Sequence, residues 1–153
     1  MSVKPIPDGY HSITPYLVMK NAAGAIGFYK SAFGAEELMR MEAPGGKIAH
    51  AELRIGDSPV MLADEHPDEG FVGPETVGGT PVSILLYVDD VDQVFARAIE
   101  AGATELKPLA NQFYGDRSGA LKDPFGHVWT IATNIEDVAQ EDLERRMNEP
   151  RSS

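Results

Sequence analysis

The sequence contains Gly34-Ala35-Glu36-Glu37-Leu38 and, 68 positions later, Gly102-Ala103-Thr104-Glu105-Leu106, which differs from it at one residue. The same offset pairs Val60 with Val128. An offset that holds from the end of a helix through a hairpin favours an internal duplication over coincidence. We therefore expect two copies of one structural module.

Each copy is predicted to run strand, helix and then three strands. The first helix is predicted over residues 22–33, because apolar residues recur there at helical spacing and Gly34 follows as a stop. The second is predicted over residues 89–101 and ends at Gly102. The expected strands cover residues 13–19, 37–42, 48–55 and 60–63 in the first copy, and residues 83–88, 104–107, 118–122 and 128–132 in the second.

These elements predict a single α+β domain that covers residues 1–153. The first module is expected over about residues 12–65 and the second over about 81–134. Residues 66–80, which are rich in Gly, Pro and acidic residues, are expected to link them. Residues 136–149 are predicted to form a charged helical extension, which either packs on a partner subunit or is a solvated tail.

The composition argues against several classes of function. The formal net charge of -11 argues against a nucleic-acid groove or an anionic membrane surface, since both need clustered Lys and Arg. Because cysteine is absent, disulfides, thiolate nucleophiles and Cys-based zinc sites are excluded. No apolar run suits a signal peptide or a transmembrane helix, so we expect a cytoplasmic protein.

Two motifs carry a resemblance to a known superfamily. Phe28-Tyr29 followed by Phe33-Gly34 resembles its first helix, and Asp123-Pro124-Phe125-Gly126-His127 resembles its last hairpin. The sequence is similar in these motifs to the glyoxalase/bleomycin-resistance/extradiol-dioxygenase (vicinal oxygen chelate) superfamily, over roughly residues 12–134. Two further stretches resemble its PhnB-like branch: Asp64-Glu65-His66-Pro67 and Tyr114-Gly115-Asp116-Arg117.

The resemblance implies a fold, a partner and a ligand. Each module is expected to curl its sheet into half a barrel, so that two modules build an open half-barrel cup. Because many relatives complete this cup between subunits, the resemblance implies a homodimer. It also implies a small-molecule ligand in the cup, which many relatives hold through a divalent metal.

The metal ligands that the resemblance implies are not retained. Metal-dependent relatives place one ligand, usually His or Glu, on the first and the last strand of each module. Counting from the helices and hairpins puts these positions at Thr14, Leu62, Ser83 and Thr130. Hydroxyls are weak neutral donors and Leu62 has no donor, so we expect no cofactor, with a relocated divalent metal as the alternative.

Four titratable residues are candidate catalytic groups: His50, Glu52, Asp64 and Arg117. His50 either projects into the cup as a base or is a hydrogen-bonded structural histidine. Asp64 and the two residues after it either serve acid–base chemistry or cation binding, or cap a solvated loop.

The loop from Tyr114 to Arg117 has two interpretations. Its aromatic ring and guanidinium suit an anionic or planar ligand at the mouth of the cup. Alternatively, Asp116 and Arg117 form an ion pair, or pair with a partner subunit, and fix the loop. Strand alternation and this loop together predict the ligand-binding residues Thr14, Tyr16, Leu62, Asp64, Ser83, Leu85, Tyr114, Arg117 and Thr130. Trp129 alternates with Thr130 and is expected in the core.

Three functions compete. The first is a metal-free, dimeric small-molecule-binding protein of the bleomycin-resistance type, which suits a mixed apolar and hydroxylic cup. The second is a lyase, isomerase or dioxygenase of the same superfamily, with a relocated metal or none. The third is a non-catalytic interaction module that uses the C-terminal helix as its contact surface.

Overall fold

The computed structural model describes residues 2–150 and contains two open four-stranded sheets, ordered β1-β4-β3-β2 and β5-β8-β7-β6. The α+β architecture predicted from the sequence is confirmed. The first module contains β1 (Tyr16–Met19), α1 (Ala22–Phe33), β2 (Glu36–Ala43), β3 (Lys47–Ile55) and β4 (Ser58–Asp64). The second contains β5 (Ser83–Tyr87), α3 (Val91–Glu100), β6 (Thr104–Asn111), β7 (Asp116–Lys122) and β8 (Val128–Asn134).

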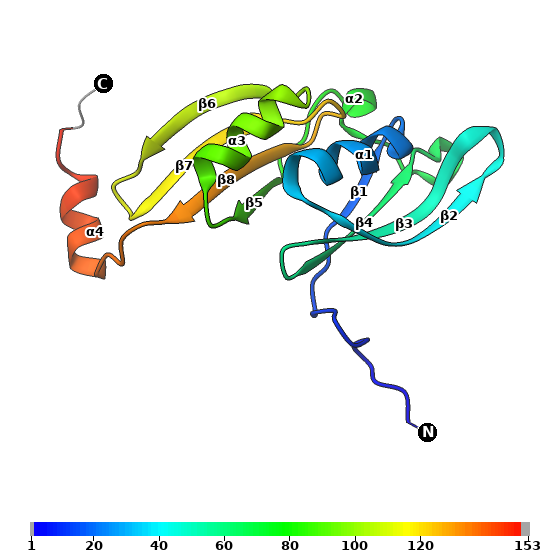
Figure 1. The fold of residues 1–153 in the computed structure, drawn as a ribbon, viewed down its shortest axis with the longest axis horizontal. Coiled ribbons are helices and arrows are strands. Elements are labelled where there is room, and N and C mark those ends of the chain that lie inside the picture. Colours follow the sequence, from blue (N-terminus) through cyan, green and yellow to red (C-terminus); the bar gives the residue numbers. More distant parts are fainter. Residues whose placement is uncertain (1, 151–153) are drawn as a thin grey trace.

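The two modules lie side by side along the long axis of the molecule, with α1 and α3 next to each other at its middle (Figure 1). In each module the first strand pairs in parallel with the last, and the other neighbours are antiparallel. The helix therefore serves as the crossover that returns the chain to its own sheet. The N-terminal segment, in blue, extends away from β1.

Local chemistry explains where the long helices begin and end. The side chain of Asn21 accepts a hydrogen bond from the Gly24 amide at 3.1 Å, and Asp90 caps α3 in the same way. Gly34 ends α1 at φ 68°, a left-handed conformation that glycine adopts without steric cost. The predicted stop at Gly34 is thus confirmed.

The core is shared between the modules. Trp129 of β8 is fully buried, as expected, and its ring lies 4.8 Å from Phe33 and 5.4 Å from Tyr29, both on α1. Aromatic rings at these separations pack favourably, so the first module's helix stabilises the second module's sheet. One buried core therefore spans both modules.

The β7–β8 hairpin is one residue longer than its counterpart in the first module. Leu53 of β3 pairs with Val60, whereas the equivalent Leu121 of β7 pairs with Trp129. The offset between copies is therefore 68 from the end of the helix to β7 and 69 in the last strand. The register gives 69 for the first strand as well, where Tyr16 corresponds to Leu85. The predicted pairing of Val60 with Val128 is wrong by one residue, because the extra residue lies in the turn.

The segment between the modules contains two short helical pieces, η2 (Pro67–Glu69) and α2 (Pro74–Val77). Glu65 ties it to the end of β4. Its carboxylate accepts hydrogen bonds from the Gly73 amide at 2.6 Å and from the Thr76 hydroxyl. The bond from Gly73 is the main reason why the pKa of Glu65 falls below its usual value.

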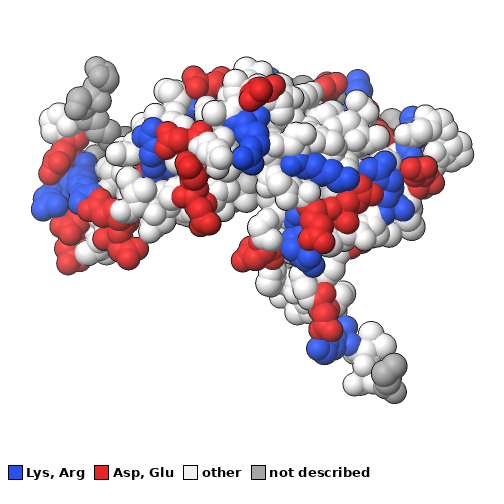
Figure 2. Space-filling view, viewed as in Figure 1, with Lys and Arg blue, Asp and Glu red and all other residues white. Residues whose placement is uncertain are grey.

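The C-terminal helix α4 (Gln140–Met147) lies at the end of the molecule beyond the β6–β7 turn (Figure 1). Arg146 holds it there through two bonds of 2.9 Å to Glu136 and one of 3.0 Å to the Phe113 carbonyl. Figure 2 shows acidic and basic side chains interspersed around this end. Within residues 2–150, no helix is long and apolar enough to cross a membrane.

Candidate functional site

Each sheet has one face covered by its helix and one open face. On the open face of the first sheet, Tyr16 and Val18 of β1 lie beside Met61 and Ala63 of β4. The alternate residues, such as Leu17, point toward the helix and are buried. Because side chains alternate along a strand, this register decides which residues can meet a ligand.

A chain of hydrogen bonds crosses the open face of the first module. The Tyr16 hydroxyl lies 2.8 Å from His50 Nδ1, and His50 Nε2 lies 2.8 Å from Glu52 Oε2. The hydroxyl of Tyr10, in the N-terminal segment, donates to the other oxygen of Glu52. The structure thus brings together three predicted site residues, Tyr16, His50 and Glu52, and adds Tyr10.

The direction of this chain follows from the carboxylate. An ionised Glu52 can only accept, so His50 must donate from Nε2–H. In the neutral imidazole Nδ1 then carries a lone pair and accepts from the Tyr16 hydroxyl. Partial burial raises the pKa of Tyr16 above its usual value, which keeps the phenol protonated and able to donate.

Tyr16 also lines a cavity of about 470 Å³ on this side of the molecule. Val18 and Ala63 line it beside Tyr16, and Phe71, from the segment between the modules, contributes an aromatic ring. The other lining residues are apolar (Ala43, Ile48 and Ala49) or polar (Lys47, Asp64, Glu65, His66 and Glu69). A mostly apolar cavity with a few polar groups is typical of a site for a small organic ligand.

Asp64 lies at the edge of this cavity, but its carboxylate serves the backbone. Oδ1 accepts from the Ala22 amide at 3.0 Å and Oδ2 from the Ile48 amide at 2.6 Å. The first bond supplies an acceptor at the N-terminus of α1, where backbone donors lack helical partners. The role of the carboxylate is therefore structural, but it lies at a helix start and on β3 and not in the solvated loop that the sequence suggested.

Leu62 is not on the open face. It is fully buried in the core beside Leu17, so its predicted place in the cup is wrong. The longer second hairpin explains the error: the residue of β4 equivalent to Thr130 is Met61. The four metal-ligand positions that the resemblance implies therefore correspond to Thr14, Met61, Ser83 and Thr130.

This donor set does not fit a divalent metal. Three neutral hydroxyls and one thioether provide neither the imidazole nor the carboxylate that such ions require. Elsewhere in residues 2–150, no three or more His, Cys, Asp or Glu side chains are grouped closely enough to hold a metal ion.

The second module presents a different open face. Ser83 and Leu85 of β5 lie beside Val128 and Thr130 of β8, as the strand alternation predicted. Leu85 is 49% exposed. These residues come from the second sheet, whereas Tyr16, His50 and Glu52 belong to the first.

A second hydrogen-bonded tyrosine lies on this face. Tyr87 donates to the buried carboxylate of Asp116 at 2.8 Å, and Asn134 donates to its other oxygen at 3.2 Å. The bond to Asp116 is the main reason why the pKa of Tyr87 rises above its usual value. The positions equivalent to His50 and Glu52 are Ser118 and Ala120, so the second module has no imidazole here.

Arg117 points to the helix side of its sheet, not into the cup. Its guanidinium donates to Asp92 of α3 at 2.8 and 3.0 Å and to Asn111 at 3.2 Å. The ion pair raises the pKa of Arg117 and lowers that of Asp92. Tyr114 is exposed in the β6–β7 turn, where its ring contacts that of Phe113. The predicted cluster at the cup mouth is therefore not assembled.

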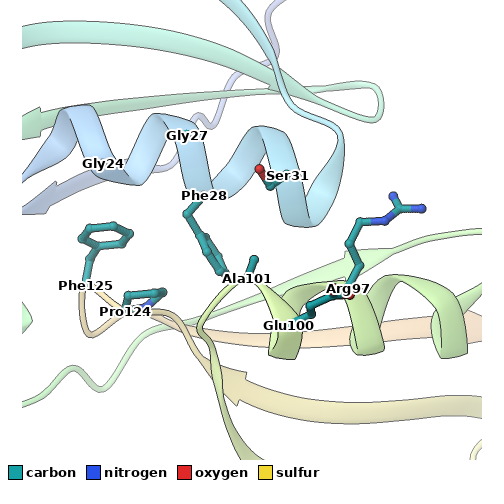
Figure 3. Close-up of a pocket in the computed structure, with 9 residues that line it drawn as sticks. All are labelled: Gly24, Gly27, Phe28, Ser31, Arg97, Glu100, Ala101, Pro124 and Phe125. Atoms are coloured by element: carbon teal, nitrogen blue, oxygen red, sulfur yellow. The ribbon is translucent and has the colours of Figure 1, made fainter.

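A larger hollow of about 650 Å³ lies on the opposite, helix-covered side (Figure 3). Phe28 and Phe125 line it, and two helical glycines, Gly24 and Gly27, leave room beside them. Its polar side chains are Ser31, Arg97 and Glu100. It lacks a hydrogen-bonded titratable chain like that of Tyr16, so the open-face cavity is the stronger candidate site.

Sequence reasoning missed several residues of the candidate site. Val18 follows from the same alternation that selected Tyr16, so this omission was avoidable. Phe71 lies in the segment expected to be only a linker, and Tyr10 precedes the first module. No pattern in the sequence brings either of them to the open face.

The comparison with known proteins agrees with this geometry. Residues 10–131 match the family described as the Glyoxalase/Bleomycin resistance protein/Dioxygenase superfamily. The chain belongs to this superfamily. The protein Mb0911c of Mycobacterium bovis is 44% identical to this chain over 140 residues, which are 90% of this chain and 92% of Mb0911c.

Solved structures of other proteins share the fold. The X-ray structure of the Arabidopsis thaliana At5g48480 gene product is 28% identical, with a TM-score of 0.67 over 80% of this chain and 98% of that one. A PhnB protein from Bacillus cereus is 22% identical, with a TM-score of 0.62 over 80% and 99%. The resemblance to the PhnB-like branch is thus supported at the level of the fold.

Proposed function

We propose that this superfamily member binds a small organic molecule in the open-face cavity of its first module, without a metal. The observation that carries the proposal is the cavity of about 470 Å³, where apolar walls meet the hydrogen-bonded phenol of Tyr16. Such a site can hold an apolar body and orient it by a few polar contacts. The donor set at the superfamily's metal positions supports binding that needs no metal.

Filling the cavity tests the proposal. The neutral dye Nile red reports by fluorescence on apolar cavities, and native mass spectrometry detects carried-over ligand. Val18→Trp should lower the affinity for the dye by about ten-fold or more, since a bulky ring occupies the space of the ligand. Ser31→Trp, which fills the helix-side hollow, is the matched control and should leave binding unchanged.

Two results contradict binding in the open-face cavity. The first is loss of dye binding in Ser31→Trp but not in Val18→Trp, which places the ligand on the helix side. The second is a wild-type protein with neither saturable dye binding nor a carried-over molecule.

The proposal includes a homodimer that covers the second module's open face. Leu85 and Tyr87 there are 49% and 58% exposed, and Leu106 of β6 is also exposed. Burying such side chains against another subunit stabilises an interface. A cytoplasmic location and the absence of nucleic-acid partners, inferred from composition, belong to the same proposal.

Sedimentation velocity tests the dimer. Leu85→Glu should shift the protein to monomer, because a charge at an apolar interface is desolvated without a partner. Met147→Glu, on the exposed face of α4, should leave it dimeric. A monomeric wild type overturns the dimer. Dissociation by Met147→Glu alone instead favours α4 as the contact surface, as the interaction-module hypothesis holds.

A further inference from the structure

We propose that Tyr16, His50 and Glu52 form a proton relay in which Tyr16 is a general base toward the ligand in the open-face cavity. This inference rests on the proposed function, because the relay ends at a residue that lines the cavity. The ligand class is a small organic molecule with a weakly acidic O–H, or with a C–H beside a carbonyl group. The remaining predicted catalytic residues, Asp64 and Arg117, have no part in it.

The first argument is the orientation of the hydrogen bonds. With Glu52 ionised and His50 protonated on Nε2, the Tyr16 proton is directed at the lone pair of Nδ1, 2.8 Å away. The phenol oxygen is then left with lone pairs only, so it presents an acceptor to the ligand. A hydroxyl, an imidazole base and an orienting carboxylate stand in sequence, which is the arrangement that activates a hydroxyl group.

The proton transfer balances without any further reactant. The ligand's O–H or C–H bond breaks, its electron pair stays on the ligand, and the proton forms the new O–H bond of Tyr16. The original Tyr16 proton moves to Nδ1 of His50, which becomes an imidazolium ion. Glu52 stabilises that cation through the bond it already accepts from Nε2–H.

The second argument is the support that the relay receives from its surroundings. The side chains of His50 and Glu52 are only 20% and 19% exposed, so water screens their interaction less than it would on the surface. Tyr10 donates to the second oxygen of Glu52 and holds the carboxylate in place. Across the sheet His50 faces Met41 of β2, which carries no charge to compete with Glu52.

The third argument is the contrast with the other module. Tyr87 also lies on a first strand and an open face, and it is 58% exposed against 47% for Tyr16. Its hydroxyl, however, donates directly to Asp116, and Ser118 stands where His50 would be. By strand register Leu85 is the counterpart of Tyr16, and Tyr87 that of Val18. Tyr87 is thus an open-face phenol without an imidazole partner, and it serves as an internal control.

Limited acetylation with N-acetylimidazole, followed by peptide mass mapping, tests the relay. The reagent's acetyl carbon bonds to the phenol oxygen, its C–N bond breaks, and imidazole leaves with a proton. If His50 accepts the phenol proton, Tyr16 should react on the order of 10²-fold faster than Tyr87. A merely structural bond predicts a rate at Tyr16 no higher than that at Tyr87, because both phenols are already hydrogen-bonded.

Variants complete the test. His50→Gln should reduce the rate at Tyr16 to about that at Tyr87, and Glu52→Gln should reduce it in part. Tyr29, which is fully buried, reports on folding because it reacts only in an unfolded chain. If Tyr29 reacts in His50→Gln, that variant is unfolded. The rates at Tyr16 in the wild type and in Glu52→Gln then decide whether the relay exists.

Equal rates at Tyr16 and Tyr87 in the wild type overturn the relay, as does an unchanged Tyr16 rate in a folded His50→Gln. The experiment uses no cavity ligand, so its failure leaves the binding proposal standing. If Nile red does not bind, the binding proposal fails, and the acetylation rates still decide whether the relay exists.

Discussion

The hydroxyl of Tyr29 on α1 donates to Oδ2 of Asp123 in the β7–β8 hairpin at 2.5 Å, across 94 residues of chain. Asp123 is buried and also accepts from Trp129 Nε1 at 2.9 Å and from the amides of Phe125 and His127 at 2.9 and 3.0 Å. Burial, and then this carboxylate, raise the pKa of Tyr29 well above its usual value. One carboxylate thus shapes the hairpin and joins the two modules.

Removing this link should lower the stability of the whole domain. Tyr29→Phe should cost about 1–3 kcal/mol in the free energy of unfolding, because one donor to a charged acceptor is lost. Asp123→Ala should cost more, about 3–5 kcal/mol, since buried donors are left without partners. Urea denaturation measures both, with the exposed Tyr114→Phe as control. A Tyr29→Phe protein as stable as that control contradicts the prediction.

Stability should fall in acid partly through Glu37. Hydrogen bonds from Arg40 and then Lys30 lower the pKa of this carboxyl from 4.5 to about 2 in the folded protein. A depressed folded pKa contributes stability above about pH 4.5 and loses it as the pH falls toward 2. Glu37→Gln should therefore weaken the dependence of stability on pH between 4.5 and 2. At neutral pH it should lower the free energy of unfolding by about 0.5–1 kcal/mol, because the ion pair is partly exposed.

The neighbouring Glu36 is the control for this measurement. It is exposed, and its ion pair with Arg54 is longer, at 3.4 Å. Glu36→Gln should leave the pH dependence of unfolding close to that of the wild type. If both variants follow the wild-type curve from pH 5 to pH 2, Glu37 has been assigned the wrong role.

Arg117→Ala should separate stability from binding. The guanidinium is paired with Asp92 on the helix side, so its loss should lower the free energy of unfolding only slightly, because water screens an exposed ion pair. Nile red affinity and the acetylation rate of Tyr16 should not change. If this variant loses dye binding while its stability is unchanged, the ligand binds at the β6–β7 loop and not in the open-face cavity.

Chelation should have no effect on binding. Protein purified without chelators should hold less than stoichiometric divalent metal by elemental analysis, and treatment with EDTA should change neither its melting temperature nor its Nile red affinity. This follows from hydroxyl and thioether groups at the superfamily's ligand positions. Stoichiometric metal that is lost in Thr130→Ala contradicts it.

The elements of the fold could be predicted because local signals and packing agree. Apolar periodicity and Gly34 located α1 at the bounds that the structure shows, and the repeat revealed both modules. The alternation of side chains on β5 and β8 correctly assigned Leu85 and Thr130 to the open face and Trp129 to the core. In the first module the same reasoning failed at Leu62, since a residue added in a turn is invisible to a constant offset.

The candidate site was predictable only in part. His50 and Glu52 alternate on one strand, so their common face follows from the sequence. The bond between His50 and Tyr16 depends on sheet order, which places β4 between β1 and β3. The partners of Asp64 and Arg117 are a backbone amide at a helix start and a side chain on α3. Such long-range contacts have no periodic signature.

The longer hairpin of the second module has a practical consequence for protein engineering. A designer who rebuilds a metal centre by copying one half onto the other would place a histidine at Leu62, inside the core, and destabilise the protein. The register of the strands instead selects Thr14, Met61, Ser83 and Thr130 as the residues to replace. In a duplicated fold, equivalent residues for grafting must be chosen from the register of the hydrogen-bonded strands and not from a constant offset in residue number.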